Sequence, residues 1–175
     1  MLYRDSTRNV QAQGVGDRCA RLAAANINPA TGLASDYLNH FNEAIMLLEM
    51  LADCAECMGA FLAWRPKNYR EHFIDSDSEC GQIAVAAYDL ADPDARARLE
   101  TLTDAMTAVL EATRTAINAG IRTGMSPTSV AAVAGHASAA LRPLVARAGA
   151  VINGEPAMHG TPSPQLAVDA LMRAG

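Results

Sequence analysis

Apolar residues recur every three or four positions along most of this chain, and this spacing predicts helices. The pattern is strongest in the C-terminal half, in two segments that each open on a capping side chain followed at once by proline. We expect helices over about residues 93–118 and 127–151, packed as antiparallel neighbours because the link between them is short. Leu102 and Leu141 lie on their apolar seams and should be buried. Pro143 should kink the second helix.

The N-terminal half predicts a further long helix, from an N-cap at Ser35 to about Asp53. Phe41 and Ile45 share its main apolar face, and its second half is apolar nearly all round, which is typical of a helix buried on several sides. Proline, glycine and capping residues mark shorter helices elsewhere. These are expected over about residues 15–26, 54–61, 68–74, 79–90 and 163–172.

The fold class that follows is all-α, because no segment alternates apolar and polar residues as a half-buried strand would. We expect an irregular helical bundle of about five to seven helices, with the long antiparallel hairpin in its C-terminal half. Residues 13–152 should form the bundle. Residues 1–12 should be a flexible arm, and residues 153–175 a Pro/Gly-rich linker with a short last helix.

The composition of the chain argues against several classes of function. The net charge of −5 argues against a nucleic-acid partner, which would need a basic surface. No uninterrupted apolar run reaches about 18 residues, so no membrane span is expected. The first residues do not resemble a signal peptide, so we expect a cytoplasmic protein whose four cysteines, Cys19, Cys54, Cys57 and Cys80, are reduced.

Asp36, His40 and Glu43 share one stripe of the helix expected from Ser35, at spacings that let their side chains meet. Three interpretations stay open. The stripe could bind zinc, iron or manganese, it could be a solvated face, or His40 and Glu43 could form a buried polar network with Asn39 and Asn42. A two-metal bundle needs a second ligand motif that the chain lacks, so we expect no metal cofactor and keep metal binding as the alternative.

Cys54 and Cys57 form a Cys-x-x-Cys pair, which is a weak signal alone. A zinc site would need two more ligands, such as Cys80 and His72, at spacings that match no usual pattern. Thioredoxin-like chemistry would want the pair at a helix N-terminus beside a βαβ unit, and no strand is expected. We therefore favour cysteines that serve as small apolar core residues.

The stretch that begins at Trp64 concentrates aromatic and basic residues. Trp64, Arg65, Tyr69 and Arg70 are residue types that favour interaction surfaces, and they could also form an anion pocket. The structural alternative, which we prefer, is a corner packed by Trp64 and Phe73 with the arginines reaching to water.

Methionine-rich apolar surface often meets a partner, and Met46, Leu47 and Met50 lie opposite the main apolar face of their helix. From this we expect a non-enzymatic interaction or regulatory protein that forms a homo-oligomer, most simply a homodimer. The alternative is a metal- or small-ligand-binding bundle centred on the stripe of His40. The pattern does not decide whether such a site would be enzymatic.

Overall fold

The structure, a computed structural model, describes residue 22 and residues 25–51 and 54–155. The expected arm over residues 1–12, most of the expected helix over 15–26, and the expected C-terminal helix lie outside this part of the chain. The fold is all-α, as predicted. In chain order its helices are η1 (Ser35–Tyr37), α2 (Leu38–Met50), α3 (Ala55–Ala63), α4 (Tyr69–Ile74), α5 (Glu79–Asp89), α6 (Pro93–Arg122) and α7 (Pro127–Ile152).

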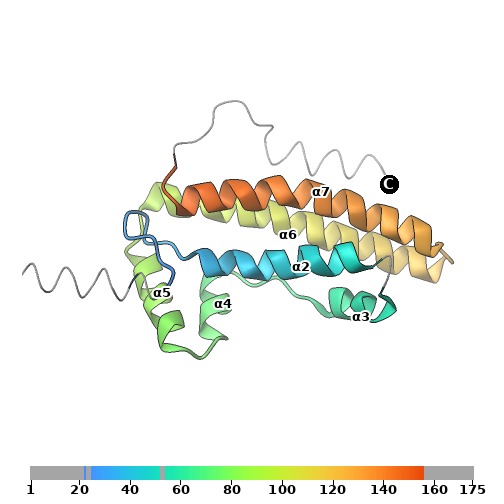
Figure 1. The fold of residues 1–175 in the computed structure, drawn as a ribbon, viewed down its shortest axis with the longest axis horizontal. Helices are drawn as coiled ribbons and strands as arrows, with labels where there is room; N and C mark the ends of the chain where they lie inside the picture. Colours follow the sequence, from blue (N-terminus) through green and yellow to red (C-terminus); the bar gives the residue numbers. More distant parts are fainter. Residues whose placement is uncertain (1–21, 23–24, 52–53, 156–175) are drawn as a thin grey trace, which may run out of the picture.

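The long helices α6 and α7 form the antiparallel hairpin that the sequence predicts, and α2 lies along α7 (Figure 1). The short helix α3 sits near the end of the molecule that carries the α6–α7 turn, while α4 and α5 lie toward the other end (Figure 1). An extended segment, residues 64–68, runs from α3 back to α4. This segment matters because it forms one wall of the main cleft.

Local signals explain the hairpin ends. The Asp92 side chain accepts a hydrogen bond from the backbone of Ala95 at 2.8 Å, and Ser126 caps α7 in the same way. The helix α6 runs a turn further than expected and ends in a Schellman motif. There Gly124 has a φ of +79°, a left-handed conformation that glycine adopts without steric cost, and Met125 donates to the carbonyl of Gly120 at 2.8 Å.

The hairpin supplies much of the core. Leu102 and Leu141 are both buried, as predicted, in one continuous cluster that also takes in Phe41 of α2. Pro143 lies inside α7, and the helix is continuous across it. Burial of apolar side chains from all the helices α2 to α7 in one cluster is the main stabilising contribution that the fold displays.

The start and the second half of α2 differ from the expectation. The chain enters α2 through η1, whose N-cap is Ala34 without a side-chain hydrogen bond, so Ser35 does not cap the helix. The predicted burial of the second half on several sides is wrong, because Met46 and Met50 are 52% and 43% exposed. The neighbours of α2 within the described residues cover its Phe41 face and leave this side open.

The loop before η1 closes the end of the bundle. Ile27 and Ala34 pair through an isolated β-bridge, and the Thr31 hydroxyl donates to the carbonyl of Ile152 at 2.7 Å. This bond satisfies one of the carbonyls left free at the C-terminus of α7.

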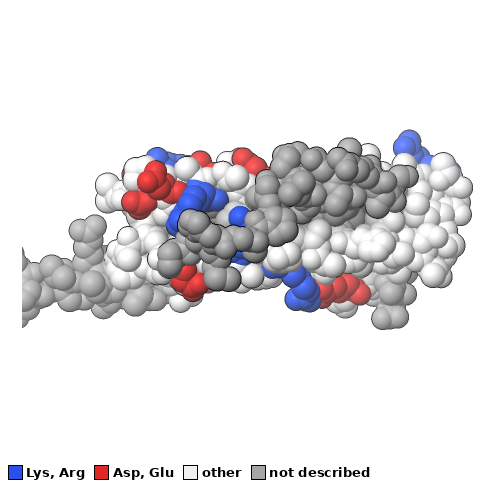
Figure 2. Space-filling model, turned by 90° about the horizontal axis from the view of Figure 1, so that it is seen from above, with Lys and Arg blue, Asp and Glu red and all other residues white. Residues whose placement is uncertain are grey.

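Seen from the α7 side, the end that carries the α6–α7 turn is largely uncharged (Figure 2). The sequence explains this, because residues 123–141 contain no Lys, Arg, Asp or Glu. In the described part of the chain, no helix combines the length and apolar character needed to cross a membrane.

Candidate functional site

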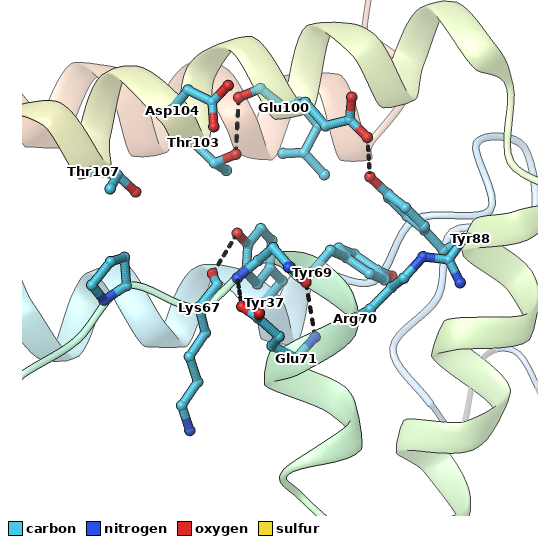
Figure 3. A pocket seen from close by; sticks show the side chains of 13 residues that line it. Tyr37, Lys67, Tyr69, Arg70, Glu71, Tyr88, Glu100, Thr103, Asp104 and Thr107 are labelled. Carbon is cyan, nitrogen blue, oxygen red and sulfur yellow. Dashed lines mark hydrogen bonds between the residues drawn. The ribbon is translucent and has the colours of Figure 1, made fainter.

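A cleft of about 540 Å³ lies between the first half of α6 and the segment that links α3 to α4 (Figure 3). Carboxylate and hydroxyl side chains of α6 form one wall, and residues 66–71 together with Tyr37 and Tyr88 form the other. The α6 wall consists of Leu99, Glu100, Thr103, Asp104 and Thr107. The facing wall includes Tyr37, Lys67, Tyr69, Arg70, Glu71 and Tyr88.

The backbone of Lys67 is held from both sides by the start of the α2 region. The Lys67 N–H donates to Nε2 of His40 at 3.1 Å, and the Tyr37 hydroxyl donates to the Lys67 carbonyl at 2.9 Å. Burial raises the pKa of Tyr37 to about 12, so its hydroxyl keeps the proton that it donates. An extended segment has no internal hydrogen bonds, and these two side chains take their place.

The next residues fix α4 and its tyrosine. Asn68 and Glu71 form a capping box, in which each side chain accepts from the backbone N–H of the other. The Tyr69 hydroxyl accepts from the backbone of Ala34 at 2.8 Å. Its ring stacks on that of Tyr88, with centroids 4.2 Å apart. The tyrosine wall is therefore built from three elements locked together.

The α6 wall presents two carboxylates one helical turn apart, those of Glu100 and Asp104. The Tyr88 hydroxyl donates to Glu100 at 2.5 Å, and both burial and this carboxylate raise the pKa of Tyr88. Within the residues that the structure describes, the carboxylate of Asp104 makes no hydrogen bond or ion pair. Asp104 is exposed and lines the cleft, so its charge is available to a ligand.

The two cations of the cleft are already paired. Lys67 Nζ lies 2.9 Å from a carboxylate oxygen of Asp75, and Arg70 pairs with Asp89. Neither acid is among the lining residues, so both cations are balanced from outside the cleft. Glu100 and Asp104, the α6 carboxylates of the cleft, lack such a charged partner in the described residues, and the cleft therefore favours positive charge.

The three residues of the stripe, Asp36, His40 and Glu43, lie in different environments. Asn39, Asn42 and Glu43 are exposed, as a solvated face predicts, whereas His40 is buried. Asp36 accepts from the side chain of Asn26 at 3.1 and 3.2 Å. The stripe therefore does not form the buried network of neighbouring helix residues considered above. His40 alone is drawn inward, and its partner is the backbone of a distant segment.

The His40 ring is packed among other rings. It stacks on Trp64 with centroids 4.6 Å apart and lies 5.9 Å from His72. Burial lowers the pKa of His40 to about 4, and the charges of His72 and Lys67 act in the same direction. Burial also lowers the pKa of His72. A neutral imidazole is what the hydrogen bond from the Lys67 backbone requires, because Nε2 must carry no proton there.

Metal binding at Asp36, His40 and Glu43 stays a prediction without geometric support. Across residues 25–51 and 54–155, no three His, Cys, Asp or Glu side chains are grouped so that they could hold a metal ion. The zinc set considered for Cys54, Cys57 and Cys80 falls under the same finding.

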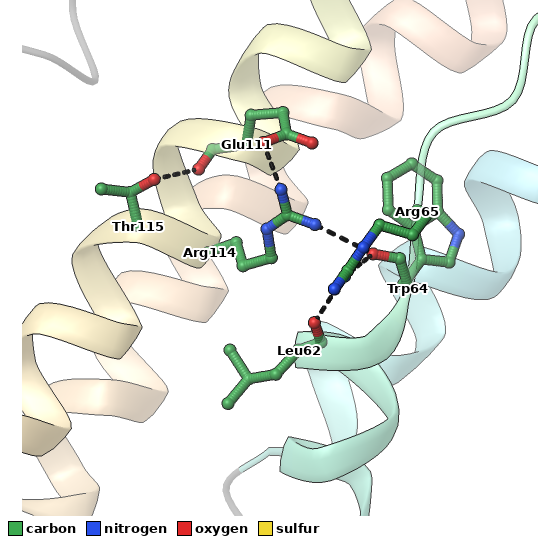
Figure 4. Close-up of polar contacts among 6 residues, drawn as sticks. All are labelled: Leu62, Trp64, Arg65, Glu111, Arg114 and Thr115. Atoms are coloured by element: carbon green, nitrogen blue, oxygen red, sulfur yellow. Dashed lines mark hydrogen bonds and ion pairs between the residues drawn. The ribbon is translucent and has the colours of Figure 1, made fainter.

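The corner after α3 is packed as the structural alternative predicts. Trp64, Tyr69 and Phe73 are buried, while Arg65 and Arg70 are exposed. Two arginines converge on the Trp64 carbonyl at the end of α3 (Figure 4). Arg65 donates to it at 2.8 Å and Arg114, which also pairs with Glu111, at 3.1 Å. Arginines at this place satisfy free carbonyls and oppose the negative end of the helix dipole.

The other surface residues singled out lie on the open side of α2. Met46 and Met50 are exposed and Leu47 is half-buried. The cysteine pair lies at the following helix: Cys57 is buried, as the core interpretation predicts, whereas Cys54 is only half-buried.

Glu100 and Asp104 did not stand out in the sequence as site residues. Helical spacing places them away from the apolar seam of α6, and they are exposed, but this face forms a wall of the cleft. The available signal was a pair of acids four residues apart on a helix, together with unexplained tyrosines at positions 37, 69 and 88.

No protein-family model matches the chain, and no curated protein or solved structure shows significant similarity to it.

Proposed function

We propose that this chain is a non-enzymatic, small-ligand-binding helical bundle, and that the cleft between α6 and residues 66–71 binds a small organic cation. The observation that carries the proposal is the charge arrangement of the cleft. Its cations are paired with acids outside it, whereas Glu100 has only a phenol partner and Asp104 has no partner in the described residues. An incoming amine or guanidinium would supply the missing charge.

The size and lining of the cleft support a small molecule. Its volume of about 540 Å³ falls in the range of small-molecule sites, roughly 300–1,000 Å³. Leu99, which is only 1% exposed, lies behind the α6 wall, and Thr103 and Thr107 line the same wall. Arg70 and Arg96 already lie over the Tyr88 ring, 5.5 and 5.6 Å from its centroid. An added cation would therefore be expected at the carboxylates, with its uncharged body along the rest of the α6 wall.

Calorimetric titration of the full chain with linear monoamines, diamines and polyamines tests this proposal. We expect saturable binding of at least one amine, and weaker binding as salt rises, because the carboxylates are exposed. Carboxylic acids and neutral alcohols of matched length should not bind.

The matched variants are Asp104→Asn in the cleft and Glu43→Gln on the exposed face of α2. Asp104→Asn should weaken amine binding by about 1–2 kcal/mol, roughly five- to thirty-fold, while Glu43→Gln should leave it unchanged. Equal binding by both variants, or no saturable binding of any amine, would contradict the proposal.

A second proposal follows from the open side of α2. Met46 and Met50 place flexible apolar side chains in water, and surfaces of this kind are typical of protein interaction sites. We propose that a second copy of this chain covers them, which would make the protein a homodimer whose interaction role depends on α2. Sedimentation tests this proposal independently of the cleft, because the two surfaces share no residue.

A further inference from the structure

The Cys-x-x-Cys pair, which the proposed function does not use, lies at the start of a helix. Cys54 is the N-cap of α3, with extended backbone angles of φ −134° and ψ 99°. Its Sγ accepts a hydrogen bond from the backbone N–H of Cys57 at 3.3 Å. The second cysteine thus occupies the third helical position, and both sulfurs belong to the first turn of the helix.

The two thiols belong to residues three positions apart in the same helical turn. A hydrogen bond with the Cys54 side chain raises the pKa of the Cys57 thiol, and burial raises it further. The bond from the Cys57 N–H already holds Sγ of Cys54 within the first turn, and rotation about the Cα–Cβ bond of each cysteine moves its sulfur without moving the backbone. The ring that a disulfide would close contains only two intervening residues, so the rest of α3 need not rearrange.

The two cysteines differ in the way that thiol exchange requires. Cys54 is half-buried, whereas Cys57 is only 8% exposed. The sulfur of Cys54 accepts the Cys57 N–H at the N-terminus of α3, which is the positive end of the helix dipole. The pair therefore offers one accessible attacking sulfur and one protected sulfur behind it. Glu56 in the same turn opposes negative charge, which argues for moderate rather than extreme reactivity.

We propose that Cys54 and Cys57 form a redox-active dithiol site whose substrates are accessible disulfides. The thiolate of Cys54 attacks one sulfur of the substrate disulfide, forms a mixed disulfide and releases the other sulfur as a thiolate. The thiolate of Cys57 then attacks Sγ of Cys54, closes the Cys54–Cys57 disulfide and releases the second substrate thiolate. Two electrons pass to the substrate, which takes up two protons, and the chain loses two protons and gains one S–S bond.

The test uses the full chain carrying Cys19→Ser and Cys80→Ser, so that only the pair can react. The protein is equilibrated in buffers of reduced and oxidised glutathione, quenched with an alkylating reagent and analysed by peptide mass spectrometry. We expect an intramolecular disulfide that forms and reverses as the glutathione ratio changes. Absence of this disulfide under every ratio would overturn the proposal.

Single variants separate the two roles. With Cys57→Ser, glutathione should remain attached to Cys54, because the resolving thiol is missing. With Cys54→Ser, the buried Cys57 should react at least about tenfold more slowly than Cys54 does in the other variant. Circular dichroism verifies that both variants fold. Equal rates in the two folded variants would show two ordinary thiols and would refute an attacking and a resolving cysteine.

Discussion

Nε2 of His40 lies 3.1 Å from the backbone nitrogen of Lys67 and accepts its hydrogen bond. Tyr37, three residues earlier, holds the carbonyl of the same residue. Both backbone groups of one residue in an extended segment are thus satisfied by side chains from the start of the α2 region. This relationship ties the extended segment to the start of α2, and it explains why a histidine is buried without a charged partner.

Removal of the His40 imidazole should leave the Lys67 N–H without its acceptor. We expect His40→Ala to lower the free energy of unfolding by about 1–3 kcal/mol, the range for an unpaired buried group. His40→Gln should cost less, because an amide oxygen can accept the same hydrogen bond. Urea denaturation measures both, and the exposed His136→Ala serves as control. A loss of less than about 0.5 kcal/mol for His40→Ala would lie in the range of surface substitutions. Such a result would show that His40 does not support the segment at Lys67.

Stability should fall as the pH drops below neutrality. The folded-state pKa of His40, about 4, lies below its ordinary value of 6.5, so the unfolded chain binds the proton more readily. The contribution of the neutral His40 to the free energy of unfolding is fully present above pH 6.5 and is lost as pH falls toward 4. This contribution amounts to at most about 3 kcal/mol. The lowered pKa of His72 acts in the same direction. Urea denaturation between pH 7 and pH 5 should show a shallower slope for His40→Gln, and an unchanged slope would count against this account.

The hairpin core should be sensitive to truncation. Leu102→Ala and Leu141→Ala each remove a buried side chain and should cost about 2–5 kcal/mol. Leu90→Ala is the matched control, because Leu90 is 77% exposed and should change stability by less than about 0.5 kcal/mol. Thermal or urea melts compare the three. A small effect at either core position would show that the packing between α6 and α7 is misassigned.

The caps of α4 and α5 offer a pair of variants that separate stability from binding. Asn68→Ala and Ser78→Ala each remove a capping side chain and should cost about 0.5–2 kcal/mol. Only Asn68 lines the cleft and orients Tyr69, so only its loss should also weaken amine binding. Calorimetric titration after a stability measurement tests this. Equal loss of binding in both variants would indicate a general loss of folded protein.

Self-association should depend on the methionine side of α2. Met50→Glu places a charge on surface that is exposed in a single chain, so it should leave the fold intact and separate a dimer. Leu90→Glu adds the same charge at an exposed apolar residue near the other end and should leave association unchanged. Sedimentation at high micromolar concentration measures both. A monomeric unmodified protein under these conditions would remove the basis for the dimer.

The helices were predictable because their signals are local. Asp92 and Ser126, each followed by proline, mark the hairpin starts, and the three- and four-residue spacing of leucines marks its seam. The extension of α6 past Asn118 was not predicted, because a Schellman motif forms at Gly124 rather than at the earlier Gly120. With two glycines four residues apart, the sequence pattern alone does not indicate which of them ends the helix.

The site was much less predictable. Helical periodicity places His40 with Asp36 and Glu43 on an outward face, and it carries no information about a non-helical segment that crosses that face. Trp64 and Lys67 belong to such a segment and bury the imidazole. The cleft has the same origin, because its walls come from four parts of the chain that no short motif connects.

The absence of charge over residues 123–141 gives the two ends of the molecule different responses to the solvent. At the turn, the side chain of Met125 lies against Gly120, and apolar contact holds the hairpin tip together. Such contact weakens on cooling, and salt does not screen it. The exposed ion pairs around α4 and α5 behave in the opposite way, since salt screens them. Cold solvent should therefore fray the hairpin tip first, and concentrated salt should loosen the cleft end first.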